Sequence, residues 1–300
     1  MNPKHLILTL LLMLCPIGMA AQSTITRHKP KPAVTKPKPA AKPKPKAKAK
    51  TAPRRNSTHH SGSTSSTVSL SAELNKLINN MVYVSGGTFT MGGTSEQGSD
   101  AYNDEKPTHS VTLSSYYICK YEVTQALWCA VMGSNPALDK GDNLPVEQVS
   151  WDDCQTFINR LNSYTGRNFR LPTEAEWEFA ARGGNNSRHY KYSGSNYISD
   201  VAWYCDNSGN RTHSVGTKQA NELGLYDMSG NVWEWCSDRY GSYSSYSQSN
   251  PTGATSGFGR VERGGNWCGL ARYCCSSHRS YYAPGNSFDD LGLRLVLSQL

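Results

Sequence analysis

Three stretches of the chain place apolar residues three and four positions apart, which is the spacing of one face of a helix. They lie within residues 124–133, 151–166 and 173–184. Thr124 can cap the first stretch, Thr173 and Glu176 form a capping box for the third, and glycines follow all three. We therefore predict three short helices. Their buried residues would be Leu127, Trp128, Val131, Trp151, Cys154, Phe157, Ile158, Leu161, Trp177 and Ala180.

Apolar and polar residues alternate along residues 82–90, 109–113 and 293–297, which predicts strands. Most of the remaining chain after residue 78 is rich in Gly, Asn, Ser and Tyr. Irregular chain brings little apolar burial against the entropy lost on ordering it. We therefore expect crosslinks or bound ions to help hold the domain together.

The N-terminus has the pattern of an export signal. Lys4 and His5 precede an apolar run over residues 6–14, and small residues follow at Gly18 and Ala20. We assign residues 1–20 to a signal peptide and expect the protein to be exported, whether periplasmic, in the cell envelope or extracellular. No later apolar run is long enough to span a bilayer, so we expect no transmembrane segment after cleavage.

Residues 21–77 read as a flexible linker. The part from 27 to 55 contains twelve Lys or Arg, seven Pro and no acidic residue, a composition that cannot bury a core. Ser and Thr clustering extends this character through residues 57–69. We therefore place the folded domain at residues 78–300.

Charge is divided unevenly along the chain. Lys and Arg total 31 against 23 Asp and Glu, but residues 56–300 hold 18 basic and 23 acidic residues. The folded part is therefore acidic, and we expect no nucleic-acid partner. A basic tail of this kind can contact anionic envelope polymers, or it can serve as a solvated spacer.

Eight cysteines would remain in the mature chain. An even number permits disulfides in an exported protein, although their pairing cannot be deduced from sequence. No Cys-x-x-Cys pair occurs, which argues against a zinc site. The eight are Cys119, Cys129, Cys154, Cys205, Cys236, Cys268, Cys274 and Cys275.

Residues 224–235 combine glycines, carboxylates and tryptophans in one short run. Asp227 and Glu234 offer carboxylate oxygens, and Gly230 lets the backbone bend so that carbonyls around Val232 can point to the same place. Calcium binds such oxygen shells. The alternative is a buried tight turn in which Glu234 forms a salt bridge and the tryptophans belong to the core.

This run and five further motifs resemble the formylglycine-generating enzyme family, the sulfatase-modifying-factor domain. The resemblance covers about residues 78–297 and implies an α+β, C-type-lectin-like fold, loop-rich with few short helices and strands. The other motifs lie at residues 81–92, 121–124, 145–151, 170–178 and 263–272 with 291–295.

The resemblance implies two calcium sites. The first would use Asp227 and Glu234 side chains with the Gly230 and Val232 carbonyls. The second would use the Asn207 side chain with carbonyls of Val201 and Gly209, or would be a plain Asn-Ser-Gly turn without metal.

The oxidases of this family bind copper(I) through two cysteines that are separated by four residues. Here Cys274 matches the second position, whereas Gly269 occupies the first and Cys268 lies one residue early. In an extended strand, a shift of one residue moves a side chain to the opposite face. Asn266 also replaces the expected serine. Cys268 and Cys274 are thus the candidate catalytic pair, and both departures argue against oxidase activity.

Other enzyme classes find less support. The pair Glu174 and Glu176 could serve a glycosidase, as could Asp152 and Asp153, but all four fall at predicted helix starts, where acids are favoured. No nucleophile motif accompanies the scattered histidines.

The C-terminal region also resembles the variable region of diversity-generating-retroelement proteins. Mixtures of Tyr, Ser, Gly and Asp are typical of adaptable binding surfaces. The candidate ligand-binding residues are Trp267, Tyr273, His278, Tyr281, Tyr282, Phe288 and Asp289, with an ordinary surface loop as the alternative.

Taken together, the sequence predicts an exported, calcium-stabilised binding or display module for a protein or glycan ligand, without oxidase activity. One alternative is a copper-dependent oxidase that converts a sulfatase cysteine to formylglycine. Another is a structural envelope component of secretion or gliding machinery.

Overall fold

The computed structural model describes residues 64–298, and side chains from Leu70 onward. All of them belong to one compact unit, His59–Leu300. The predicted signal peptide and the basic segment lie outside the described residues. Within residues 64–298, no helix is both long enough and apolar enough to cross a membrane.

The structure is mixed α and β with short elements, as predicted. The helices are α1 (Thr64–Asn79), α2 (Gln125–Met132), α3 (Trp151–Thr165), α4 (Glu174–Ala181) and α5 (Ile198–Val201). Tighter 3-10 turns are η1 (Gly98–Asp100), η2 (Asn103–Glu105), η3 (Gly184–Asn186) and η4 (Ala271–Cys274).

The described strands form three small sheets. The first has the order β1-β4-β11-β5, the second β10-β6-β8-β9 and the third β2-β3-β7. The strands are β1 (Met81–Val84), β2 (Gly87–Met91), β3 (His109–Leu113), β4 (Tyr116–Cys119), β5 (Phe169–Arg170), β6 (Trp233–Arg239), β7 (Gln248–Ser249), β8 (Arg260–Arg263), β9 (Arg279–Tyr282), β10 (Leu291–Leu293) and β11 (Val296–Leu297).

The three predicted helices are confirmed as α2, α3 and α4. Thr124 caps α2 by accepting a hydrogen bond from the Leu127 amide, and Gly133 ends it in the left-handed conformation. Capping boxes start α3 and α4, and the box of α4 joins Thr173 to Glu176 as predicted. Side-chain oxygens there satisfy amides that the first helical turn leaves unpaired.

Helix α1 overturns part of the predicted linker. It begins at Thr64, so ordered structure starts earlier than the predicted boundary at residue 78. Leu70, Leu74 and Ile78 pack against a hydrophobic cluster that also contains Leu77. The helical spacing of these four apolar residues could have predicted α1. The Ser- and Thr-rich composition of the preceding segment instead favoured a linker.

Two predicted strands are each divided in the structure. Residues 82–90 form β1 and β2, which belong to different sheets. A side chain at Gly86 would come within 2.5 Å of the Leu113 carbonyl oxygen, so the backbone turns there at close approach. Residues 293–297 divide between β10 and β11, because the chain between them turns Arg294 into the interior.

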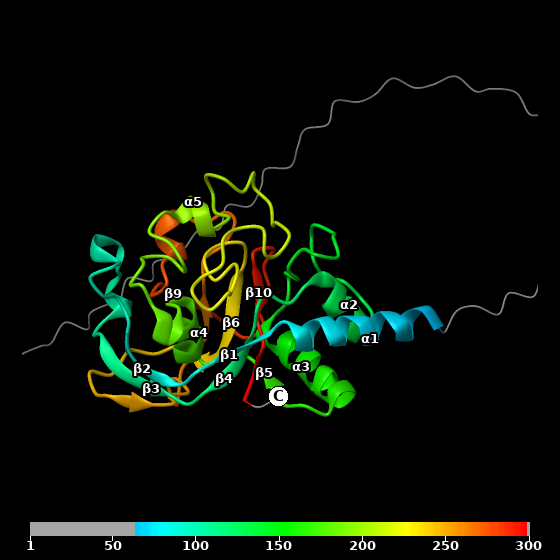
Figure 1. Ribbon diagram of the computed structural model, residues 1–300, viewed down its shortest axis with the longest axis horizontal. Coiled ribbons are helices and arrows are strands. Elements are labelled where there is room, and N and C mark those ends of the chain that lie inside the picture. Colours follow the sequence, from blue (N-terminus) through cyan, green and yellow to red (C-terminus); the bar gives the residue numbers. More distant parts are fainter. Residues whose placement is uncertain (1–63, 299–300) are drawn as a thin grey trace, which may run out of the picture. The chain divides into compact units, whose positions relative to one another are not determined.

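Two large hydrophobic clusters build most of the core of the described residues, and a third, smaller one contains Tyr192 and Val201. One joins α1, α2 and α3 to Trp233, Trp235 and the strands that follow residue 290. The other packs α4 against β2 and β3. Figure 1 shows the three helices together on one side of the domain and β2 and β3 on the other. The second sheet lies between them and carries the motifs with candidate chemistry.

Candidate functional site

The C-terminal segment between β8 and β10, residues 264–290, contains the candidate thiols and ligand residues. Residues 266–269 form a turn in which the Gly269 amide donates to the Asn266 carbonyl at 3.2 Å. The helical turn η4 follows, and β9 starts only at Arg279. The predicted extended strand through the two thiols is therefore wrong, because local turn hydrogen bonds replace strand pairing there.

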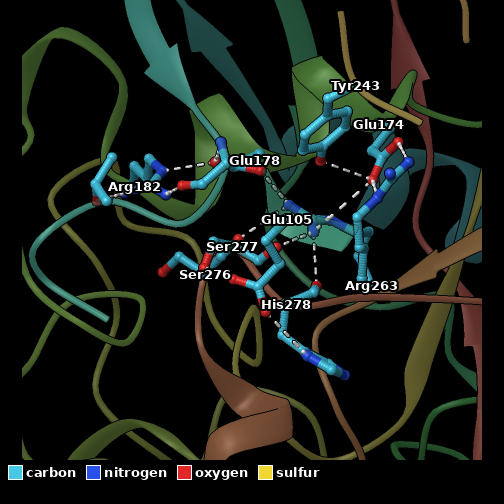
Figure 2. A network of polar contacts seen from close by, with 12 residues as sticks. Glu105, Glu174, Glu178, Arg182, Tyr243, Arg263, Ser276, Ser277 and His278 are labelled. Carbon is cyan, nitrogen blue, oxygen red and sulfur yellow. Dashed lines mark hydrogen bonds and ion pairs between the residues drawn. The ribbon is translucent and has the colours of Figure 1, made fainter. Parts of the chain in front are cut away.

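A buried arginine holds the middle of this segment. Arg263 is fully buried and donates to the carbonyl oxygens of Ser276, Ser277 and His278 at 3.0, 2.7 and 2.6 Å. It also pairs with the buried carboxylate of Glu178. Figure 2 shows Arg263 between these carbonyls and Glu178. Charge-assisted bonds of this kind fix the segment's backbone position.

Further ion pairs surround Arg263. Glu174 accepts two bonds from Arg279, at 2.7 and 2.6 Å. Burial alone would raise the pKa of Glu174, but the Arg279 and Arg263 guanidiniums outweigh it and hold that pKa below its usual value. Glu105 accepts from Ser277 at 2.6 Å. No local sequence pattern predicts this network, because only tertiary structure brings these distant positions together.

The two candidate catalytic cysteines occupy different surroundings. Cys268 is exposed, and its sulfur lies 3.7 Å from Oδ2 of Asp290. Cys274 is fully buried, and burial raises the pKa of its thiol far above the usual value. Neither cysteine is part of a disulfide. A copper(I) dithiolate needs two sulfurs that face the same site.

Asn266 fills the space beside the first thiol position of the family motif. A Cβ atom at Gly269 would lie 2.5 Å from Oδ1 of Asn266, well inside normal contact distance. Asn266 is buried, and its amide nitrogen donates to Asp290. Asn266 in place of the family's serine and Gly269 in place of its cysteine are therefore linked. An asparagine at 266 and a cysteine at 269 would compete for the same space.

The predicted ligand residues fall into separate groups. His278 is only 5% exposed, and its ring centroid lies 5.1 Å from that of Tyr273 and 5.7 Å from that of Trp233. Tyr102, from the loop before η2, packs against both His278 and Tyr273. The structure thus adds Tyr102 to this group and places His278 beneath the surface.

A second group joins Trp267 to Asp289, because the indole nitrogen donates to the Asp289 carbonyl at 3.1 Å. Tyr282 and Phe288 pack together near the core, with ring centroids 4.7 Å apart. Tyr281, in contrast, is 42% exposed and stacks on Tyr240. Successive strand residues point to opposite faces, so Tyr281 and Tyr282 do not share one surface.

Two cavities lie away from these groups. One of about 300 Å³ is bounded by α1 and the loop of residues 120–124, and another of about 180 Å³ lies beside Glu174 and Arg279. None of the seven predicted ligand residues lines either cavity. These two cavities are therefore separate from the predicted ligand surface.

Glu234 of the first predicted calcium site is fully buried and ion-paired. Arg294 donates to its carboxylate at 2.7 Å, and the Trp177 indole donates at 2.7 Å. Asp227 accepts the Gly216 amide at 2.7 Å. The salt bridge predicted as the alternative for Glu234 is therefore present.

Three buried carboxylates, Glu122, Asp227 and Glu234, lie around the single guanidinium of Arg294. Burial raises the pKa of Asp227 to about 6, and burial with the Asp227 and Glu234 charges raises that of Glu122 well above normal. If all are ionised, two negative charges remain, which a divalent cation would balance. Within residues 64–298 no three His, Cys, Asp or Glu side chains converge as metal ligands. Backbone carbonyls would therefore have to complete a calcium shell.

Asn207 of the second predicted calcium site makes a local turn. Its side-chain oxygen accepts the Tyr204 amide at 2.9 Å, and its nitrogen donates to the Ala202 carbonyl at 2.9 Å. Val201 is buried at the end of α5, and Gly209 has the left-handed φ of 64°. With both polar ends of Asn207 engaged, the geometry favours the plain turn.

Comparison with known proteins identifies the family. Residues 67–299 match the sulfatase-modifying factor enzyme 1-like domain. The chain therefore belongs to this family. The chaperone protein LppX of Paenibacillus barcinonensis is 35% identical over 258 residues, which cover 69% of this chain and 88% of that protein. The formylglycine-generating enzyme of Mus musculus is 29% identical over 289 residues, covering 73% and 75%.

Solved structures agree with this assignment. Treponema denticola variable protein 1 has 34% identity and a TM-score of 0.67, covering 73% of this chain and 95% of its own. PvdO from Pseudomonas aeruginosa has 26% identity and a TM-score of 0.64, covering 73% and 94%. The C-type-lectin-like fold and both resemblances drawn from sequence motifs are confirmed.

Proposed function

We propose that this protein is an exported binding or display module that uses the formylglycine-generating-enzyme fold without its oxidase chemistry. The observation that carries the proposal is the first thiol position, where Gly269 replaces cysteine and Asn266 occupies the space a side chain would need. The remaining thiol, Cys274, is fully buried, and burial raises its pKa far above the usual value.

The ligand surface in this proposal is the exposed side of the C-terminal segment. Half-buried Trp267, Tyr273 and Asp289 supply it, and Tyr102 extends it from a separate loop. The buried Arg263 network holds the backbone beneath, so surface side chains can change without moving the frame. Such a frame suits a macromolecular ligand, since aromatic and polar side chains on a fixed backbone are typical of adaptable binding surfaces.

Calcium would stabilise the frame in this proposal. The ion would bind Asp227 and carbonyl oxygens near Gly230 and Val232, beside the paired Glu234. The support is the gathering of three buried carboxylates around one guanidinium, an arrangement that costs free energy unless protons or a cation balance the surplus of acidic groups. Its role would be structural, with no part in a reaction.

The relatives favour the proposal without deciding it. One similar chain is named as a chaperone and another as a variable protein, so members of the family have roles other than oxidation. The oxidase remains the second candidate because the mouse formylglycine-generating enzyme is 29% identical over 73% of this chain.

The test is an assay for oxidase activity. Purified protein is incubated with copper, oxygen, a reductant and a peptide that contains Cys-x-Pro-x-Arg. We expect the peptide mass to stay unchanged, because no copper dithiolate can form. Loss of the thiol with gain of an aldehyde would establish the oxidase instead.

A further inference from the structure

A cavity of about 300 Å³ lies beside α1. One of its walls is lined by Glu73, Lys76, Leu77 and Asn80. Residues that lie three, four and seven positions apart share one face of a helix, so α1 turns a single face toward the cavity. Figure 1 shows α1 running alongside α2, and Leu127 of α2 lines the cavity as well. Two neighbouring helices therefore form one side of the cavity.

The inner part of this cavity is apolar. Leu77, Val123 and Leu127 line it, and each is buried in the core. Asn143 and Ser214, which are exposed, line its outer part. Because the lining runs from buried to exposed residues, the cavity opens to solvent. An apolar interior with a few polar groups is typical of sites that bind small molecules.

The charged side chains of the lining are already engaged. Lys76 donates to Glu73 at 2.6 Å, so these two charges balance each other. Both carboxylate oxygens of Glu122 accept hydrogen bonds, from the Asn231 side chain at 2.7 Å and from the Val232 amide at 3.2 Å. A charged ligand would therefore lose its water without gaining an opposite charge of its own.

Four uncharged side chains of the lining have hydrogen-bonding capacity left. Within residues 64–298, no hydrogen bond engages the polar ends of Asn80, Tyr121, Asn143 and Ser214. The loops that carry Asn143 and Ser214 are joined, since the Val215 amide donates to the Asn143 carbonyl at 3.0 Å. Side-chain amides and hydroxyls can both donate and accept. They therefore suit the neutral polar groups of a ligand.

We infer that this cavity binds a small neutral molecule that has an apolar body and an amide or hydroxyl group at one end. The apolar body contacts Leu77, Val123 and Leu127, and the polar end bonds to the uncharged side chains of the lining. Burial of the apolar body supplies most of the affinity, whereas the polar groups set the orientation. The inference does not depend on the proposed binding function, because no lining residue belongs to the C-terminal segment.

The test uses three probes that share an indole ring and differ in charge. Indole-3-acetamide is neutral, tryptamine is a cation and indole-3-acetate is an anion at neutral pH. Each is titrated into the full-length protein, and binding is followed by the NMR chemical shifts of backbone amides. We expect the shifts to include those of Leu77, Val123 and Leu127. Indole-3-acetamide should bind at least about tenfold more tightly than either charged probe, because an unpaired charge loses its hydration.

Two variants and a control locate the site. Val215→Trp places a larger side chain in the lining and should abolish the shifts. Asn143→Asp adds a negative charge to the outer part of the cavity and should raise the affinity for tryptamine about two- to five-fold. Asn168→Asp, at an exposed position outside the lining, should leave that affinity unchanged.

Three results would overturn the inference. They are equal binding of all three probes, tighter binding of a charged probe, and the absence of shifts at the lining residues of the wild type. The wild-type titration decides the matter even if Val215→Trp fails to fold.

Discussion

Oδ1 of Asn266 lies 2.5 Å from the place where a Cβ atom of residue 269 would be. Asn266 cannot easily move aside, because it is buried and its amide nitrogen donates to Asp290. Gly269 has no left-handed φ, so its backbone would accept a side chain if the space were free. The asparagine therefore excludes the first thiol of the family motif.

Replacement of Gly269 by cysteine should therefore destabilise the protein. Crowding in a packed region typically costs about 1–3 kcal/mol. Adding Asn266→Ser should recover most of that loss, so the two substitutions should be coupled by about 1 kcal/mol or more in a double-mutant cycle. Urea unfolding of the wild type, both single variants and the double variant measures the coupling.

Gly285→Cys is the matched control, since a Cβ atom there would meet nothing within 4 Å. It should change stability by less than about 0.5 kcal/mol. Strictly additive costs for the Asn266 and Gly269 substitutions would contradict the spatial competition.

Arg263→Met should destabilise the domain strongly. The substitution removes one of the two guanidiniums that pair with the buried Glu178 carboxylate, leaving only Arg182, and it removes donors from three carbonyl oxygens. Breaking a buried pair in this way typically costs about 3–5 kcal/mol. Urea unfolding measures the loss, and Arg239→Met, at an exposed arginine, serves as the control. A loss below about 1 kcal/mol at Arg263 would show that the network does not hold the frame.

Asp238 should make stability depend on pH. Burial, with the nearby Glu174 charge, raises the pKa of Asp238 to about 7, above its unfolded value near 4. The unfolded chain therefore loses this proton first, and stability falls as pH rises from about 4 to 7. The full cost above pH 7 is on the order of 4 kcal/mol, at 1.36 kcal/mol for each pKa unit.

Asp238→Asn removes this titration while keeping an oxygen that can accept from the Glu174 amide and the Ser237 hydroxyl. We expect the variant to be more stable than the wild type at pH 8 and to have a shallower pH dependence between pH 4 and 7. Unfolding free energies at pH 5 and pH 8 provide the comparison. If the unfolding free energy changes with pH by the same amount in both proteins, the pKa of Asp238 is not raised in the folded state.

Calcium should raise the melting temperature, and EDTA should lower it. A ligand present at about 100 times its dissociation constant stabilises the folded state by about 2.7 kcal/mol. Asp227→Asn should weaken the response because it removes a carboxylate from the proposed site. Asp238→Asn lies outside that site and should keep the response. If neither calcium nor EDTA changes the melting temperature, the proposal that calcium stabilises the fold is wrong.

Local signals in the sequence were sufficient for the helices. Thr124, Thr173 with Glu176, and the glycines after each helix act within a few residues of their own position, so spacing alone revealed α2, α3 and α4. Strand β3 also matched its predicted bounds. The divided strands were missed because their breaks depend on tertiary contacts, such as the close approach of Gly86 to Leu113.

The candidate site was predicted in part. Counting along the motif assigned Gly269 and Cys274 to the two thiol positions, and that assignment stays a prediction. The strand argument about them was wrong, because a turn and η4 replace the strand. The contribution of Tyr102 could not be seen, since it comes from a loop 171 residues before Tyr273 and meets it only in the folded chain.

The most direct test of the central claim is copper(I) binding by the reduced protein, measured by competition with a chromophoric copper(I) chelator under anaerobic conditions. The account predicts that the chain removes no stoichiometric copper from the chelator, because Cys274 is buried and residue 269 lacks a thiol. Transfer of one copper per chain, lost in both Cys268→Ser and Cys274→Ser, would contradict it.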